Sequence, residues 1–348
     1  MARKIKENET LEEVVVATEE QNVESLDNPI LVSIDNGKMN MKARCRGKEY
    51  IYKNNIQKGK SKGGLLGKDT HNVTFYEIDY IVGDTATEKN REEGKARSED
   101  IITTLTVITK FIEELNYQKK GLKFIVTYGE SMNKYFSEKH QQFLRQQFVG
   151  EQKITRDGEE YEFEIVDLHV LPEGVGIVLE DLSLKKDVDD LYYITDIGGT
   201  TINFLKVVGL LPAKGECFSE KRGMTILKKK LVDFIKQNDV EINYDIVSKN
   251  LKKGGSLGNK KLDELKKRFG LEYVAKKIDE AWLSQDVNIK SMINYQPVYI
   301  TGGGAEVFKD ELEEYFRVGE DTVKIKEDAV WSNCRGFSIY GKYCLRLE

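Results

Sequence analysis

The chain has 348 residues, 39% of them hydrophobic, and its 54 basic and 59 acidic side chains give a formal net charge of −5. This apolar content excludes a wholly disordered chain, the length predicts about two domains, and the absence of any run of about 18 apolar residues argues against a membrane span. Four scattered cysteines without a C-x-x-C pair, three histidines outside any HExxH motif and the lack of a signal-peptide pattern argue against a zinc site and favour the reducing cytoplasm.

The first 28 residues carry the whole net charge. They hold three basic and eight acidic side chains and no aromatic residue, whereas residues 29–348 hold 51 basic and 51 acidic ones. Such a composition cannot bury enough apolar surface to offset the entropy lost on ordering, so we expect a mobile tail at residues 1–28. Two interpretations remain open: a solubilising extension, or a partner-binding peptide that uses Leu11 and Val14 to Val16.

The first half of the chain predicts a sheet with helices. Residues 31–35 form a short apolar strand that stops at Asp35-Asn-Gly37, and the Asn-Gly pair is typical of a tight hairpin turn. The segments that follow predict strands at 38–46, 49–53, 73–82 and 122–127, a hairpin at 153–170, a loop at 57–69, and helices at 96–117, 132–148 and from Pro172 to about residue 182.

The second half repeats this order. A strand at 191–197 stops at Gly198-Gly199-Thr200-Thr201, and its hairpin partner follows at 202–208. Helices dominate from 223 to 283, a strand at 298–301 meets Gly302-Gly303-Gly304 and a helix through 315, and the chain ends in a strand at 323–325 and a helix at 332–347. Strand, Asp-containing turn and strand thus occur twice, at Asp35 and at Asp196, which indicates an internal duplication of an α/β unit. Two such units would place the two turns face to face across a cleft.

The two turns have the composition of phosphate-binding loops. Glycine and small polar residues let backbone N–H groups point at an anion, because a bulky Cβ would block its approach. The segment from Asp35 to Lys42 offers a carboxylate, a glycine and two cations. The segment from Asp196 to Thr201 offers a carboxylate, two glycines and two hydroxyls. Each Asp can hold a hydrated Mg²⁺ without covering the amides.

A third loop has room for a ring or an anion beside bare backbone. The strand at 298–301 delivers Gly302, Gly303 and Gly304 into a helix N-terminus. Other glycine-rich pieces do not complete a known nucleotide motif. Gly59-Lys-Ser61 lacks the first glycine of a P-loop, and Gly254 to Gly258 lies among helices and not after a strand, so a Rossmann fingerprint is excluded.

In their order and spacing these three loops resemble those of the actin-like ATPase superfamily over residues 30–348. Together with Leu171-Pro-Glu-Gly174, they look most like the ParM-like plasmid-segregation actins. The resemblance implies an actin-like two-domain fold of duplicated ribonuclease-H-like α/β units, with the nucleotide cleft between the domains. It implies the tail at 1–28, a first domain at 29–190 to which the helix at 331–348 returns, and a second domain at 191–330.

The resemblance also implies roles for individual residues. Glu173 and Asp196 would be catalytic, and Glu173 would position or activate the attacking water, as a carboxylate inside a helix N-terminus can. Asp35 and Asp196 would hold Mg²⁺ through water. The residues implied to bind the nucleotide are Asp35, Gly37, Asn40, Lys42, Gly198, Gly199, Thr200, Thr201, Gly223, Gly302, Gly303 and Gly304. The sequence departs from many relatives in two places, with Lys38-Met39 in the first turn and Asn203 where an acid is frequent.

These expectations together predict a filament-forming ATPase or GTPase of bacterial cytoplasm that segregates plasmid or phage DNA. The expected ligands are ATP or GTP with Mg²⁺. The expected partners are further copies of the chain, stacked head to tail, and an adaptor protein bound to a centromere-like DNA site. No membrane contact and no direct sequence-specific DNA contact is expected. Two alternatives stay open: a small-molecule kinase of the same superfamily and a bacterial cytoskeletal actin that does not segregate DNA.

Overall fold

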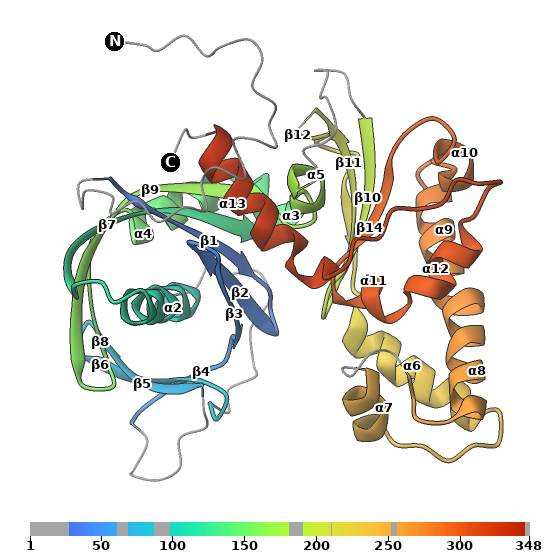
Figure 1. The fold of residues 1–348 in the computed structure, drawn as a ribbon, viewed down its shortest axis with the longest axis horizontal. Coiled ribbons are helices and arrows are strands. Elements are labelled where there is room, and N and C mark those ends of the chain that lie inside the picture. The colour runs from blue at the N-terminus through green and yellow to red at the C-terminus, as the bar shows by residue number, and fades with distance from the viewer. Residues whose placement is uncertain are drawn as a thin grey trace.

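A computed structural model describes residues 28–60, 69–86, 98–180, 191–209, 211–251 and 256–344. The expected tail therefore lies, except for its last residue, outside the described residues. Figure 1 shows two parts side by side, each built on a β-sheet, with the C-terminal helix running between them. No helix in the described ranges is long and apolar enough to cross a membrane.

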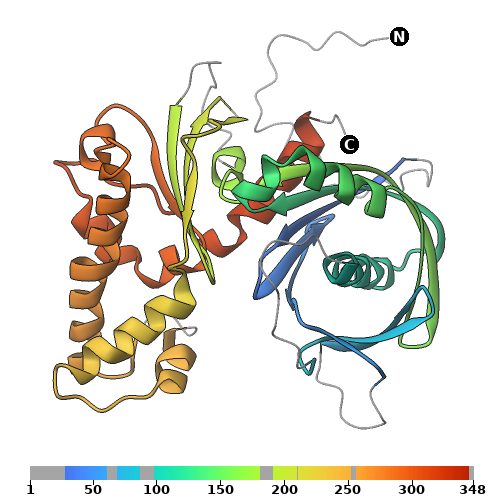
Figure 2. The same ribbon diagram turned by 180° about the vertical axis from the view of Figure 1, so that it is seen from behind.

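The first part is a nine-stranded sheet that curves around helix α2 (Ser98–Glu114), as Figure 2 shows from behind. Its strand order is β3-β2-β1-β7-β9-β8-β5-β6-β4. Apolar side chains of α2 and of the strands' inner face, such as Val32, Phe124 and Phe111, are fully buried between them. The strands are β1 (Ile30–Asn36), β2 (Asn40–Cys45), β3 (Lys48–Lys53), β4 (Ile56–Lys58), β5 (Thr70–Phe75), β6 (Ile78–Gly83), β7 (Lys120–Glu130), β8 (Gly150–Arg156) and β9 (Glu159–Pro172).

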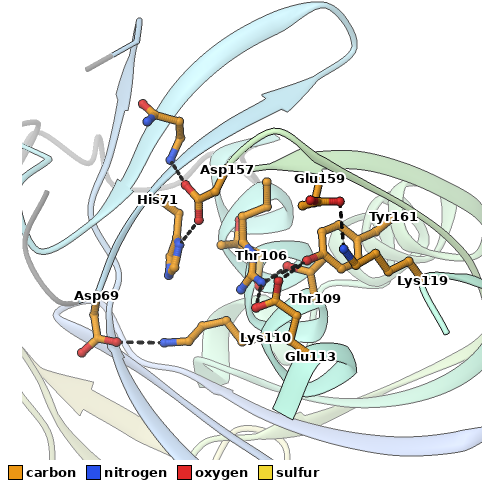
Figure 3. Close-up of polar contacts among 12 residues, drawn as sticks. Asp69, His71, Thr106, Thr109, Lys110, Glu113, Lys119, Asp157, Glu159 and Tyr161 are labelled. Carbon is orange, nitrogen blue, oxygen red and sulfur yellow. Dashed lines mark hydrogen bonds and ion pairs between the residues drawn. The ribbon is translucent and has the colours of Figure 1, made fainter. Parts of the chain in front are cut away.

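Polar contacts fasten α2 to the surrounding sheet. Figure 3 shows Lys110 and Glu113 pointing from α2 toward the strands. Lys110 pairs with Asp69 at 2.9 Å, and the Tyr161 hydroxyl donates to Glu113 at 2.5 Å. The buried Arg156 guanidinium also pairs with Glu113. Because a buried charge is tolerated only with a partner, these contacts fix the rotation of α2 inside the sheet.

The second part has a five-stranded sheet covered by helices. Its strands run in the order β12-β11-β10-β14, with β13 also paired to β11, and its core contains Trp282 and Phe204. The strands are β10 (Leu191–Ile197), β11 (Ile202–Val208), β12 (Leu211–Pro212), β13 (Phe218–Glu220) and β14 (Val298–Thr301). The helices are α6 (Met224–Lys236), α7 (Tyr244–Leu251), α8 (Lys260–Phe269), a π-helix (Gly270–Ala275), α9 (Lys276–Leu283), α10 (Ile289–Met292), α11 (Gly303–Val307) and α12 (Lys309–Tyr315).

The predicted duplication is confirmed by the strand pairing. In the first sheet, β1 pairs with β2 antiparallel and with β7 parallel. In the second, β10 pairs with β11 antiparallel and with β14 parallel. The register is also equivalent, since Asp35 lies opposite Lys42 and Asp196 lies opposite Asn203. The two acids therefore end equivalent strands.

Several predicted elements of the first half differ from the structure. Pro172 ends β9 and does not begin a helix; after a turn at Glu173-Gly174 the helix α5 spans Gly176–Glu180. The positive φ of Gly174, 94°, reverses the chain between strand and helix. Pro172 can end β9 because, among the described strands, β9 pairs only with β7 beyond Ile165, and the N–H that bonds to Glu130 of β7 there belongs to Glu173.

Other boundaries were also wrong. The expected strand 73–82 is a hairpin that turns at Tyr76-Glu77, whose φ angles of 46° and 63° are unusual for residues other than glycine. The expected helix 132–148 is two helices, α3 (Met132–Tyr135) and α4 (Glu138–Phe148), because the Ser137 side chain caps a new helix by accepting from the His140 N–H. The expected strand 323–325 is an isolated bridge from Lys324 to Tyr299, and the expected loop 57–69 begins inside β4.

Helices α5 and α13 (Ser332–Cys344) cross between the two sheets in close backbone contact. A Cβ on Gly336 would lie less than 3.0 Å from the backbone of Gly176, and a Cβ on Gly176 would lie 2.3 Å from Asn333 Cα, so both positions need glycine. Helix α13 also packs on β1 and β7, and Phe337 belongs to a buried cluster with Leu171 and Leu205 at the crossing. The crossing thus joins the two parts, while their residue boundaries remain a prediction.

Candidate functional site

Three carboxylates converge where the two sheets face each other. Asp35 comes from the end of β1, Asp196 from the end of β10, and Glu173 from the turn after β9. The side chains of both aspartates are buried, and Glu173 is partly buried. Asp35 and Asp196 lie at the ends of equivalent strands, so their meeting follows from the duplicated topology, and Glu173 joins them from the turn that follows β9. The sequence prediction that these three residues share a site agrees with this arrangement, although their roles remain predicted.

One cation lies among these acids. Lys42 Nζ pairs with Asp35 Oδ2 at 2.6 Å from the facing position on β2. Burial alone would lower the pKa of Lys42, but the pairing with Asp35 and the nearby Asp196 outweighs it and raises the pKa. Lys42 is therefore charged at neutral pH and offers a positive group to a phosphate beside the first turn.

Crowding of carboxylates changes their protonation. The pKa of Glu173 is raised to about 8, chiefly by burial and then by repulsion from Asp35, Asp196 and Glu130. The pKa of Asp196 is raised to about 6, again chiefly by burial and then by Asp35. Glu173 is thus largely neutral at pH 7 in the free protein. A positive charge entering the site would lower both pKa values, because part of each shift is repulsion between carboxylates.

Two asparagines hold these acids, and sequence reasoning did not assign either of them a role. Asn203 Nδ2 lies 3.4 Å from Glu173 Oε2, its side chain lowers the pKa of Asp196, and its own Oδ1 accepts from Ser219 at 2.7 Å. Asn333, on α13, also lowers the pKa of Asp196, and its Oδ1 accepts from the Gly174 N–H at 2.8 Å. The sequence showed Asn203 only as a departure from relatives. Nothing in the sequence pointed to Asn333, which lies 137 positions after Asp196.

The first turn is held from behind by a buried asparagine. Asn54 donates to Asn36 Oδ1 at 2.8 Å and to the Gly37 carbonyl at 3.1 Å. A Cβ on Gly37 would lie 2.5 Å from the Asn40 carbonyl, so this position requires glycine. Gly37 and Asn40 are therefore side by side in the turn. Sequence reasoning missed Asn54 because it stands after β3, outside the motif.

The second turn is bound by its carbonyls to the start of α6. The carbonyls of Gly198 and Gly199 accept from the N–H groups of Met224 and Thr225, both at 2.9 Å, and Gly223 donates to Thr200 at 3.1 Å. The backbone N–H groups of Gly199 and Thr200 have no acceptor within the described ranges. Unpaired amides on a glycine turn are what an anion-binding loop offers. The structure therefore fits this part of the nucleotide prediction.

Packing against the second turn requires glycine at position 223. A Cβ at this position would lie 2.5 Å from the Thr200 carbonyl carbon and the Thr201 nitrogen. The resemblance in the sequence implied that Gly223 binds the nucleotide. The structure places it directly behind the second turn, where it lets α6 approach the backbone, and a role toward the nucleotide stays a prediction.

The third loop also adjoins the acids. Gly302 has a φ of 85°, and a Cβ there would lie less than 3.0 Å from Asp196 Oδ1. Gly304 packs against Ile197 and Met224, whereas a Cβ on Gly303 would meet only Val330 Cγ2 at 3.7 Å. Gly302 and Gly304 are thus required by packing, and Gly303 is the glycine that leaves open backbone.

The first and second turns touch each other. A Cβ on Gly199 would lie 3.0 Å from Met39 Sδ, and the Thr225 hydroxyl lies 3.5 Å from the same sulfur. Met39 is half exposed on the first turn. The two turns therefore face each other, as the predicted duplication required. Of the sequence-predicted residues, Asp35 and Lys42 in the first segment and Gly302 in the third loop lie close to Asp196.

The donor set fits a hydrated magnesium ion. Mg²⁺ prefers oxygen ligands, keeps several waters and is usually held through one or two carboxylates plus substrate phosphates. In the described part of the chain, no group of three acidic, His or Cys side chains could hold a metal directly. Asp35 and Asp196 beside the two turns suit contacts made through water. Binding of Mg²⁺ by these residues remains a prediction.

The raised pKa of Glu173 predicts a pH-dependent stability. The folded pKa of about 8 exceeds the ordinary value of 4.5, so between these values the folded state holds more protons than the unfolded state. The free energy of unfolding of nucleotide-free protein should therefore fall as the pH rises from 5 to 8. Glu173→Gln should remove part of this fall, making the variant about 2 kcal/mol more stable than wild type at pH 8 and nearly equal at pH 5.

Urea unfolding at the two pH values measures this difference. Glu241→Gln, at an exposed position on the loop between α6 and α7, is the matched control and should follow wild type at both. Equal stabilities of wild type and Glu173→Gln at pH 8 would show that Glu173 is not held neutral in the free protein.

Comparison with known families matches most of the chain. The model described as actin like proteins N terminal domain matches residues 33–176, and the model described as plasmid segregation protein ParM, C-terminal, matches residues 186–337. A search of curated proteins gives no match.

Comparison with solved structures shows the same fold. The apo psk41 ParM protein has a TM-score of 0.71 and 15% identity, covering 92% of this chain and 99% of its own. The Alp12 filament structure has a TM-score of 0.66 and 19% identity, covering 91% and 100%. Ta0583, an archaeal actin homolog in complex with ADP, has a TM-score of 0.64 and 18% identity, covering 88% and 97%. The predicted actin-like fold is confirmed.

Proposed function

Because the chain belongs to the family of actin-like proteins that includes the plasmid segregation protein ParM, we propose that it is a filament-forming ATPase or GTPase that segregates DNA. Nucleotide binds between the two sheets, assembly follows binding, and hydrolysis weakens the contacts between subunits. An adaptor protein at a centromere-like site connects the filament to plasmid or phage DNA.

The observation that carries this proposal is the convergence of Asp35, Asp196 and Glu173 from two equivalent sheets. Two glycine turns face each other beside these acids, and the second turn offers the Gly199 and Thr200 amides, which have no acceptor among the described residues. A triphosphate suits this arrangement, because its oxygens can accept from both the amides and Lys42. The structure of Ta0583 with ADP supports nucleotide as the ligand of this fold.

The chain's own side chains supply positioning and proton transfer. Glu173, held by Asn203, accepts a hydrogen bond from the attacking water and takes its proton when ionised. Lys42 and the turn amides stabilise the charge that develops on the phosphate oxygens. A magnesium ion held through water by Asp35 and Asp196 would supply further positive charge there. That charge would favour the ionised form of Glu173, which links the general base to an occupied site.

Self-assembly follows from heterologous contacts between copies. A contact between two different surfaces of the same chain generates a helical filament whenever the rotation does not close a ring. The Alp12 structure is a filament of this fold, which supports the assembly proposed for this chain. Residues 29–348 balance 51 basic against 51 acidic side chains, so net charge does not oppose stacking.

Phosphate release and light scattering, recorded together after mixing with Mg-ATP or Mg-GTP, test this proposal. We expect scattering to rise first and phosphate release to follow, with at least one of the two nucleotides. Phosphate release without scattering, or transfer of phosphate to a small hydroxylated acceptor, would instead indicate a kinase of the same superfamily. If the protein scatters light with nucleotide but deletion of its gene does not change plasmid retention in the host, it would instead be a cytoskeletal actin that does not segregate DNA.

A further inference from the structure

Asn333 lies at the junction of two parts of the candidate site. It is the second residue of α13, and its side chain is buried. Its Oδ1 accepts from the Gly174 N–H at 2.8 Å, and its side chain lies beside the Asp196 carboxylate, whose pKa it lowers. Gly174 itself packs against Asp196, because a Cβ on Gly174 would lie 3.4 Å from Asp196 Cβ. Asn333 therefore holds the segment that packs on Asp196.

The turn that Asn333 holds is the one that carries Glu173. Gly174 follows Glu173 directly, and its φ of 94° reverses the chain. On its other side the turn is held by β7, where the Glu173 N–H donates to the Glu130 carbonyl at 2.8 Å. The backbone of the turn that carries Glu173 is thus held by two hydrogen bonds. One goes to the Glu130 carbonyl of β7, and the other goes to the Asn333 side chain of α13.

The residues beside Asn333 attach α13 to the first sheet. Cys334 Sγ lies 3.3 Å from the Ser33 carbonyl of β1, and Arg335 makes two bonds of 2.8 and 3.1 Å to Glu49 of β3. Gly174, which Asn333 holds, packs against Asp196 of β10 and Leu205 of β11 in the second sheet. This turn of α13 therefore lies where the two sheets meet.

We propose that Asn333 is a positioning residue that fixes Asp196 and the Glu173 turn relative to each other and so couples the α5–α13 crossing to hydrolysis. This inference rests on the proposed nucleotide hydrolysis. An amide is suited to the position because its oxygen accepts from the Gly174 N–H and it carries no charge. Aspartate has nearly the same shape but places a second charge beside Asp196. Alanine removes the acceptor of the Gly174 N–H without adding charge.

Steady-state hydrolysis by Asn333→Asp and Asn333→Ala tests the proposal. We expect kcat of both variants to fall about 10- to 100-fold while KM for the nucleotide stays within about threefold, because the lost Gly174 bond in one variant and the added charge beside Asp196 in the other displace groups that act in the transition state. Asn250→Asp is the matched control. Asn250 donates to the Leu257 carbonyl at 3.0 Å beyond α7, away from the acids, and its variant should keep the wild-type kcat.

The outcomes separate this inference from the proposed function. A kcat within about twofold of wild type in both Asn333 variants overturns the positioning role, as does an equal loss in Asn250→Asp. A purely structural role would lower the melting temperature and leave kcat per folded molecule unchanged, which also overturns it. If Asn333→Asp fails to fold, Asn333→Ala decides alone. Wild-type protein that hydrolyses neither ATP nor GTP overturns the proposed function instead.

Discussion

Replacement of Glu173 by glutamine is expected to slow nucleotide hydrolysis about 100-fold while leaving nucleotide binding and assembly intact. The amide keeps the size of the carboxylate and its bond to Asn203, but it cannot take a proton from water. General-base catalysis raises a reaction rate by about 10²- to 10⁴-fold, so its loss should slow hydrolysis by a similar factor. Filaments of Glu173→Gln should therefore form with the wild-type nucleotide requirement and then persist. Phosphate release and the decay of light scattering after nucleotide is exhausted measure the two effects.

Glu241→Gln serves as the control for this experiment, because it makes the same chemical change at an exposed position. It should release phosphate at the wild-type rate. Hydrolysis by Glu173→Gln within about threefold of wild type would contradict the assignment of Glu173 as the residue that activates water. Loss of nucleotide binding in this variant would mean that Glu173 holds the ligand instead.

Replacement of Gly302 by alanine is expected to destabilise the protein and to abolish nucleotide binding. A Cβ there would lie less than 3.0 Å from Asp196 Oδ1 and from the Ile197 carbonyl, and the φ of 85° is strained for any residue with a side chain. Left-handed backbone alone costs about 1–2 kcal/mol, and displacement of Asp196 adds to it. We expect the free energy of unfolding to fall by about 3 kcal/mol, measured by urea unfolding without nucleotide.

The adjacent Gly303 provides the matched control. Its Cβ would meet only Val330 Cγ2 at an ordinary distance of 3.7 Å. Gly303→Ala should therefore change the free energy of unfolding by less than about 0.5 kcal/mol. If Gly303 also lies against the bound nucleotide, the same variant will bind nucleotide more weakly at unchanged stability. Equal stability of the two variants would show that the Gly302 position is not under the steric constraint described.

The sequence was sufficient where the site is encoded in short contiguous motifs. Asp35, Asp196 and the glycine turns stand at the ends of apolar strands, and a turn that ends a buried strand can be recognised locally. Their meeting could be inferred because the same strand–turn–strand order occurs twice and duplicated units face each other. Glu173 was found through the Pro-Glu-Gly segment, although that segment was wrongly placed at the start of a helix.

The residues that support the site could not be found in this way. Asn54 and Asn333 act through contacts with chain segments 17 and 159 positions away, and neither belongs to a motif. The hairpin at Tyr76-Glu77 was missed for a related reason. Its turn has positive φ angles without glycine or asparagine, so tertiary pairing of β5 with β6 and β8 decides it against local preference.

Sedimentation in the ultracentrifuge, with and without nucleotide, tests the central claim most directly. We predict that the protein pellets with Mg-ATP or Mg-GTP, stays in the supernatant without nucleotide, and returns to the supernatant as the nucleotide is consumed by wild type but not by Glu173→Gln. Protein that stays in the supernatant as a monomer with both nucleotides would contradict the account.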